Sequence, residues 1–198
     1  MTDRTAKNVD SAFVPVTDEA LGEVVIDGRP YVLVERETLA EIQREMKAIL
    51  GRGSEGILVR AGYARGARLA TRLSTLVGGK QDAFFEGLQV FAARTGLCRI
   101  EQVRTDGARV TVRAQNSFIG IAYGPSAAPV CHYLRGFFLA VAETTVHRKG
   151  LECRELSCIA AGGGTCEFEV VPVPGSDSPS ADSQRTMEGR VTEWKSNA

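Results

Sequence analysis

The sequence lacks several features that would assign it to a common functional class. Its 24 basic and 24 acidic side chains cancel, so the sequence indicates no generally basic surface for nucleic acid or anionic lipid. No segment approaches the roughly 18 uninterrupted apolar residues of a membrane span. The polar start over residues 1–8 lacks the apolar run of a secretion signal, which predicts a cytoplasmic location, where thiols stay reduced.

Nucleotide-binding motifs are missing as well. No Gly-x-Gly-x-x-Gly fingerprint follows an expected strand, so a reductase would have to borrow its hydride donor. The Gly-Gly-Lys sequence at residues 78–80 is not a phosphate loop, because the upstream glycine is absent and Gln81 replaces the metal-binding Ser or Thr. Catalysis by this chain alone is therefore disfavoured, and we expect a binding protein in preference to an enzyme.

Hydrophobic spacing and turn residues predict hairpins and helices in alternation. We expect hairpins over 23–34 and 98–114, helices over 38–50, 54–76, 81–95 and 129–147, an extended segment over 118–123, and final strands over 151–160 and 166–171. A capping box at Thr38 would start the first helix, and Asp27-Gly28 would form a tight turn. We expect one folded domain over 21–173, between a flexible tail at 1–20 and a disordered tail at 174–198.

Two glycines lie four residues apart in the second predicted helix, at Gly62 and Gly66. Glycine inside a helix costs about 1 kcal/mol relative to alanine. We expect a neighbouring helix to approach closely at these positions. The alternative is that the small residues leave room for a ligand.

Cysteine clustering is the strongest chemical signal, because four of the five cysteines lie between Cys131 and Cys166. Cys158 and Cys166 flank the glycine-rich segment 162–164, so a hairpin can bring both sulfurs to one point. Cys131 would reach them from the first turn of the preceding helix. Clustered cysteines in a reducing compartment more often bind a metal than form disulfides.

Three thiolates with a carboxylate, a nitrogen or a water as the fourth ligand would suit tetrahedral Zn²⁺. Glu155 is a candidate, but strict alternation along a strand puts Glu155 and Cys158 on opposite faces, so a bulge near Ser157 is needed. The spacing is not that of a Cys-x-x-Cys ribbon, and buried apolar cysteines are the alternative. Cys98, isolated in a predicted strand, fits that alternative.

Pro-Val-Cys-His-Tyr-Leu-Arg-Gly-Phe at 129–137, Glu-Leu-Ser-Cys at 155–158 and Gly-Gly-Gly-Thr-Cys-Glu-Phe-Glu-Val at 162–170 resemble the 4-vinyl-reductase domain. This domain occurs in the sensory region of XylR-type, aromatic-responsive transcription activators and in stand-alone hydrocarbon-binding relatives, one group of which is linked to bacteriochlorophyll synthesis. Segments 28–33 and 56–66 resemble the front part of the same sensory region. The resemblance covers residues 23–172.

The resemblance implies an α/β (α+β) fold, in which helices pack on an antiparallel sheet. It also implies that a bound zinc ion cross-links and stabilises this ligand-binding domain. The strands and helices expected above agree with this fold. Cys153 is left over from the family's metal site, and His132 is the substitute ligand if the helix register differs. Carried over by position, the three-Cys, one-Glu zinc site of the family falls on Cys131, Glu155, Cys158 and Cys166.

The resemblance also implies a buried pocket for a small hydrophobic or aromatic molecule. Phenol-type sensors use a pocket His and Trp before the zinc helix, whereas the first histidine here is His132 and the sole tryptophan is Trp194. Phenol recognition is therefore not transferred. The candidates for the pocket lining, with ordinary core packing as the alternative for each, are Phe91, Phe118, Tyr123, Tyr133 and Phe138.

Together these points favour a zinc-stabilised sensor or carrier for a hydrophobic molecule, acting in signalling or transcription regulation through a regulatory protein partner. A homodimer is expected, since related sensory domains pair. The alternative is an accessory or carrier protein in tetrapyrrole (bacteriochlorophyll) biosynthesis. Hydrolysis at zinc, with Glu152 or His132 as the base, is disfavoured because charge donated by three thiolates lowers the Lewis acidity of the metal.

Overall fold

Five strands form the main antiparallel sheet, and three shorter strands form a second one. The computed structural model describes residues 11–175 and 192–195. The main sheet has the order β6-β7-β5-β4-β8, formed by Leu151–Ser157, Cys166–Pro172, Arg109–Gln115, Arg99–Asp106 and Thr192–Lys195. The small sheet comprises β1 (Val16–Asp18), β2 (Glu23–Ile26) and β3 (Arg29–Tyr31). The helices are α2 (Arg36–Leu50), α3 (Gly53–Val77), α4 (Gln81–Arg94), α5 (Phe118–Ala122) and α6 (His132–Thr145).

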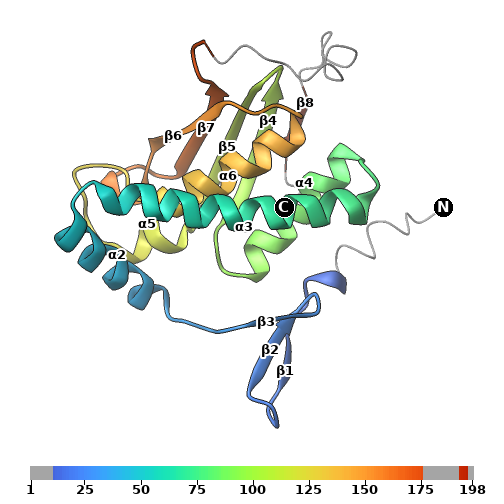
Figure 1. Ribbon diagram of the computed structural model, residues 1–198, viewed down its shortest axis with the longest axis horizontal. Helices are drawn as coiled ribbons and strands as arrows, with labels where there is room; N and C mark the ends of the chain where they lie inside the picture. Colours follow the sequence, from blue (N-terminus) through green and yellow to red (C-terminus); the bar gives the residue numbers. More distant parts are fainter. Residues whose placement is uncertain (1–10, 176–191, 196–198) are drawn as a thin grey trace.

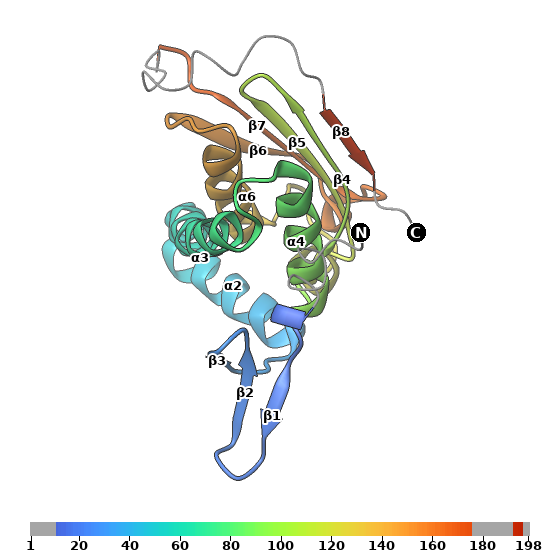
Figure 2. The same ribbon diagram turned by 90° about the vertical axis from the view of Figure 1, so that its right-hand side faces the viewer.

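The long helices lie on one face of the main sheet (Figures 1 and 2). Strand β5 shows why, because Val110, Val112 and Ala114 are buried while the residues between them are more exposed. Such alternation gives the strand one apolar face for helices and one face for solvent. Helix α6 packs against β6 and β7, and α4 packs against β4. The α+β architecture with an antiparallel sheet is thus confirmed. None of the described helices has the length and apolarity to cross a membrane.

Helices α3 and α6 touch through glycines. A Cβ atom added at Gly62 would overlap the carbonyl oxygen of Tyr133, and one at Gly66 would overlap that of Phe137. In the reverse direction, a Cβ at Gly136 of α6 would overlap the carbonyl oxygen of Val59. The close helix approach predicted for Gly62 and Gly66 is confirmed, and Gly136 is its counterpart on the other helix.

The small sheet projects from the body of the molecule (Figure 1). Asp27 and Gly28 adopt φ angles of 53° and 67°, so the predicted tight turn between β2 and β3 is confirmed. An ion pair joins Asp27 to Arg72 of α3. Two side chains of the sheet, Ile26 and Tyr31, pack against the core of the body.

Two expectations about local structure were wrong. Residues 118–122 form the short helix α5 instead of an extended segment, because the Ser117 side chain accepts a hydrogen bond from the Gly120 amide and caps the helix. Helix α2 begins at Arg36, two residues before the expected capping box, and Glu35 precedes it without a side-chain cap.

The expected tails fall partly outside the described residues, which omit 1–10, 176–191 and 196–198. Within the described part, Phe13 is 1% exposed and residues 16–18 form β1, so ordered structure begins before the expected boundary at residue 21. Strand β8 likewise lies within the segment expected to be disordered, and it pairs antiparallel with β4.

Candidate functional site

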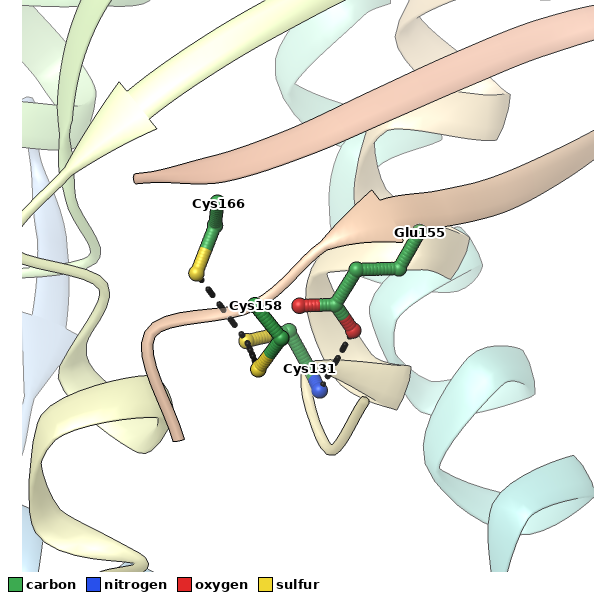
Figure 3. A group of neighbouring side chains, drawn as sticks. All are labelled: Cys131, Glu155, Cys158 and Cys166. Carbon is green, nitrogen blue, oxygen red and sulfur yellow. Dashed lines mark hydrogen bonds between the residues drawn. The ribbon is translucent and has the colours of Figure 1, made fainter. Parts of the chain in front are cut away.

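Four side chains from three separate segments meet at one end of the main sheet. Cys131 immediately precedes α6, Glu155 lies on β6, Cys158 follows β6, and Cys166 begins β7. One potential ligand atom from each residue lies within 4.8 Å of the others, and Figure 3 shows the side chains pointing toward one another. The three cysteines are buried and the glutamate is partly buried. We call these four residues the Cys/Glu cluster; it could hold a metal ion.

A bulge in β6 makes this convergence possible. The pairing of β6 with β7 shifts register between Glu155 and Ser157, as the sequence predicted. The extra residue turns Cys158 toward the side on which Glu155 lies. Beyond Cys158 the chain reverses through Gly162, whose φ angle of 88° is in the left-handed region, and returns to Cys166.

The distances within the Cys/Glu cluster suit tetrahedral coordination. The Cys131 sulfur lies 3.9 Å from the Cys158 sulfur and 3.7 Å from the Cys166 sulfur. A tetrahedron of Zn–S bonds about 2.3 Å long has edges of about 3.8 Å. The sulfur positions therefore leave space for an ion of that size between them.

The carboxylate of Glu155 is oriented in a way that leaves one oxygen for a cation. Its Oε2 accepts a hydrogen bond of 2.9 Å from the Cys131 amide. Its Oε1 is buried and has no hydrogen-bond partner within the described part of the chain. A buried carboxylate oxygen without a partner is costly, and a bound cation would remove that cost.

The electrostatics of the Cys/Glu cluster also point to a cation. Burial raises the pKa of Glu155 to about 8. Hydrogen bonds from the Cys131 and Cys166 thiols lower the pKa of Cys158, and donation of that hydrogen bond raises the pKa of Cys131. Four acidic groups so close together cannot all ionise, because their charges repel. Metal binding would release their protons and replace repulsion by coordination.

The remaining cysteines and histidines stand apart from the Cys/Glu cluster. Burial raises the pKa of Cys98 and of Cys153 to about 12, as expected for small buried thiols. The Nδ1 atom of His132 lies 3.4 Å from an Arg135 nitrogen. Glu152 pairs with Arg154. Neither base suggested for hydrolysis thus belongs to the four-residue group.

The five aromatic residues predicted for the pocket occupy different environments. Phe91 and Phe138 are buried, and both rings contact Phe137, at centroid distances of 6.5 and 5.5 Å. Phe118 and Tyr133 are half-buried and meet edge to face at 6.1 Å. Tyr123 instead lies at the end of α5, under the guanidinium of Arg44 at 5.6 Å. Their role in ligand binding stays a prediction.

Two hollows in the surface involve other residues. One of about 380 Å³ runs along α2 and is lined by Ile42, Met46 and Ile49 among others. Another of about 370 Å³ lies beside Arg135 and Cys153. Neither is lined by any of the five predicted aromatic residues, which are packed against one another and the core.

Arg65 is a half-buried charge that the sequence analysis did not predict. It lies on α3 beside Gly66, its guanidinium is 4.6 Å from the centroid of the Phe91 ring, and it donates a hydrogen bond to the Tyr31 hydroxyl. The sequence did contain one indication of this position. Arg65 adjoins Gly66, and the two glycines predict that another helix approaches there.

The fold and the Cys/Glu cluster define a class: an antiparallel sheet covered by helices, with a cluster that could hold a metal ion at the start of one helix. Residues 110–172 match the family model described as the V4R domain. Residues 16–107 match the model described as an activator of aromatic catabolism. The chain therefore matches both models, the V4R domain following the activator segment, and the predicted resemblance is confirmed.

Solved structures with a similar fold include the phenol-responsive sensory domain of the transcription activator PoxR with phenol. That likeness has a TM-score of 0.73 at 19% identity and covers 90% of this chain and 93% of the other. A trafficking protein particle complex subunit 3 from Naegleria fowleri, covalently bound to palmitic acid, gives a TM-score of 0.45 at 14% identity, covering 68% of this chain and 93% of that one. A vinyl-4-reductase family protein from Methanocaldococcus jannaschii gives 0.38 at 13%, covering 72% and 98%. No curated protein matches the chain by sequence.

Proposed function

We propose that this chain is a sensor or carrier for a small hydrophobic or aromatic molecule and that it acts in signalling or transcription regulation through a partner. One observation carries the proposal: the segments that position Cys131 of the Cys/Glu cluster also carry two of the predicted pocket aromatics. Cys131 precedes α6, which carries Tyr133, and Ser117, whose oxygen lies 3.3 Å from the Cys131 sulfur, precedes Phe118. A metal that fixes Cys131 would therefore fix the position of two aromatic side chains.

Zinc is the metal we propose, held by the three thiolates of the Cys/Glu cluster and by Glu155 Oε1. The soft sulfur ligands and the tetrahedral spacing favour zinc over calcium or magnesium, which prefer oxygen. Four protein ligands close the coordination shell, as in structural zinc sites, whereas catalytic sites keep a position open. Zinc here would stabilise the fold, and the chain would bind its ligand without transforming it.

The fold similarity to the phenol-responsive domain of PoxR and the match to the aromatic-catabolism model support ligand sensing. Phenol itself is not the ligand we propose, because no histidine or tryptophan precedes His132 in this sequence. A cytoplasmic location is part of the proposal, since reduced cysteines are required for the site.

The protein purified from its own host should carry a small aromatic or lipid-like molecule that native mass spectrometry can release and weigh. Added aromatic compounds should raise the melting temperature in proportion to their affinity, because they bind the folded state. A tetrapyrrole mass would instead favour the accessory role in pigment synthesis. If no compound co-purifies and none of a broad aromatic set shifts the melting temperature, the ligand-binding function is wrong.

We also propose that the chain forms a homodimer through the outer face of α2 and the segment before it. Ile42 and Ile49 of α2 are 50% and 78% exposed, and Val32 and Leu33 are 83% and 79% exposed. Exposed apolar side chains that gather on one element are typical of an interface.

An Ile49→Asp variant should therefore shift the chain from dimer to monomer in light scattering coupled to size exclusion, because a buried unpaired charge opposes association. Leu76→Asp on α3 is the matched control, since Leu76 is also an exposed helix residue, at 37%, but lies on another element. A wild-type monomer at micromolar concentration would contradict the dimer, and so would an Ile49→Asp variant that still dimerises.

A further inference from the structure

Arg65 is a half-buried cation on α3 that contacts two aromatic rings. Its guanidinium lies over the Phe91 ring at 4.6 Å and near the Tyr31 ring at 5.8 Å. The side chain is half-buried, and it sits where α3 and α6 approach each other through Gly62 and Gly66. Arg65 therefore points along the aromatic interior and not freely into solvent.

This charge has no acidic partner among the described residues, whereas Arg72 on the same helix pairs with Asp27. The Arg65 hydrogen bond within this part of the chain goes to the neutral hydroxyl of Tyr31. A guanidinium offers five N–H donors in a planar fork that matches a carboxylate. Most of the hydrogen-bonding capacity of Arg65 is thus left for another acceptor.

Tyr133 supplies a second donor from the facing helix. Its backbone carbonyl lies against Gly62, three residues before Arg65 on α3, and burial raises the pKa of its phenol. The ring of Tyr133 contacts Phe118 edge to face. No hydrogen bond of the Tyr133 hydroxyl occurs within the described part of the chain, and a protonated phenol is a good donor to an anion.

Resting on the ligand-binding function proposed above, we infer that Arg65 and Tyr133 form an anion-recognition pair and that the ligand is an aromatic carboxylic acid. The aromatic ring would lie among Phe91, Phe118 and their neighbours. The carboxylate would accept hydrogen bonds from Arg65 and Tyr133 and take the place of the Tyr31 hydroxyl. A monoanion matches the single guanidinium, whereas a phosphate dianion would leave a buried charge uncompensated.

The test compares benzoate with benzamide, which has nearly the same shape but no charge at pH 7. Isothermal titration of the full zinc-loaded chain should show benzoate binding at least about ten-fold more tightly, the effect of one charge-assisted hydrogen bond. An Arg65→Gln variant should lose that preference and still bind benzamide with little change. Arg60→Gln is the matched control, because Arg60 is an exposed arginine on the same helix, and the preference should remain there.

Three results would overturn the inference. Benzamide could bind wild type as tightly as benzoate, or Arg65→Gln could keep the preference, and in both cases the sensor function would survive without the anion pair. If neither compound nor a neutral hydrocarbon such as toluene binds, the proposed function fails together with it. Should Arg65→Gln not fold, Arg65→Lys replaces it: loss of the planar fork should reduce the benzoate preference several-fold, and an unchanged preference would contradict the pair.

Discussion

A Cys158→Ala variant should lose its zinc and melt far earlier than wild type. The wild-type chain should carry about one zinc per chain, and zinc-finger peptides gain roughly 10–16 kcal/mol from such binding. Even a loss of about 4 kcal/mol would lower the melting temperature of a chain of this size by roughly 10 °C. Metal analysis and thermal unfolding followed by circular dichroism give the two measurements.

Cys153→Ala provides the control, because Cys153 is also a buried thiol at β6 but stands outside the Cys/Glu cluster. It should keep its zinc and lose only the small stability expected for a shortened core side chain. Metal-free wild type with undiminished stability would refute the structural role of zinc. Equal zinc content in Cys158→Ala and wild type would refute the assignment of the ligands.

A Gly62→Ala substitution should destabilise the protein by about 2–3 kcal/mol or more, although alanine is the better helix former. The added methyl group would overlap the carbonyl oxygen of Tyr133, and because this neighbour is backbone, α3 and α6 would have to separate. Gly136→Ala should act in the same direction through its overlap with Val59. Urea unfolding measures both free energies.

Gly56→Ala is the same substitution on the same helix, but it should raise the free energy of unfolding instead of lowering it. Gly56 lies in α3, is exposed, and has open space where a Cβ would be placed. Alanine there should stabilise the chain by about 0.5–1 kcal/mol through helix propensity alone. If Gly62→Ala stabilises the protein as Gly56→Ala does, the two helices are not in backbone contact.

The residues of the Cys/Glu cluster could be named from the sequence because the family resemblance implied them, and ligand chemistry then constrained the local geometry. Glu155 and Cys158 could share a site only if β6 were interrupted, and the register shift lies between Glu155 and Ser157. Gly62 and Gly66 likewise predicted a helix contact, since glycine inside a helix is otherwise unfavourable. Which helix would make the contact depended on tertiary structure, although Gly136 of α6 is the matching glycine.

Other features could not be predicted from spacing. The alternation of Phe118 with its neighbours suggested an extended segment, but Ser117 caps a helix and tertiary packing buries Ile119 on it. The partners of Arg65 come from β3 and α4, so contacts distant in sequence determine its position. Strand β8 is joined to β4 by pairing across a long sequence separation, and its polar sequence gave no indication of it.

The glycine contact between α3 and α6 bears on how a signal could leave the molecule. Two backbones in direct contact can neither slide nor part without strain, so this pair of helices forms a fixed wall. The N-terminal region meets this wall at Arg65, which donates a hydrogen bond to the Tyr31 hydroxyl, and Phe13 packs edge to face on Phe91. Because the two helices are fixed against each other, a change at the contact between Arg65 and Tyr31 would move the β-hairpin and not the helix pair.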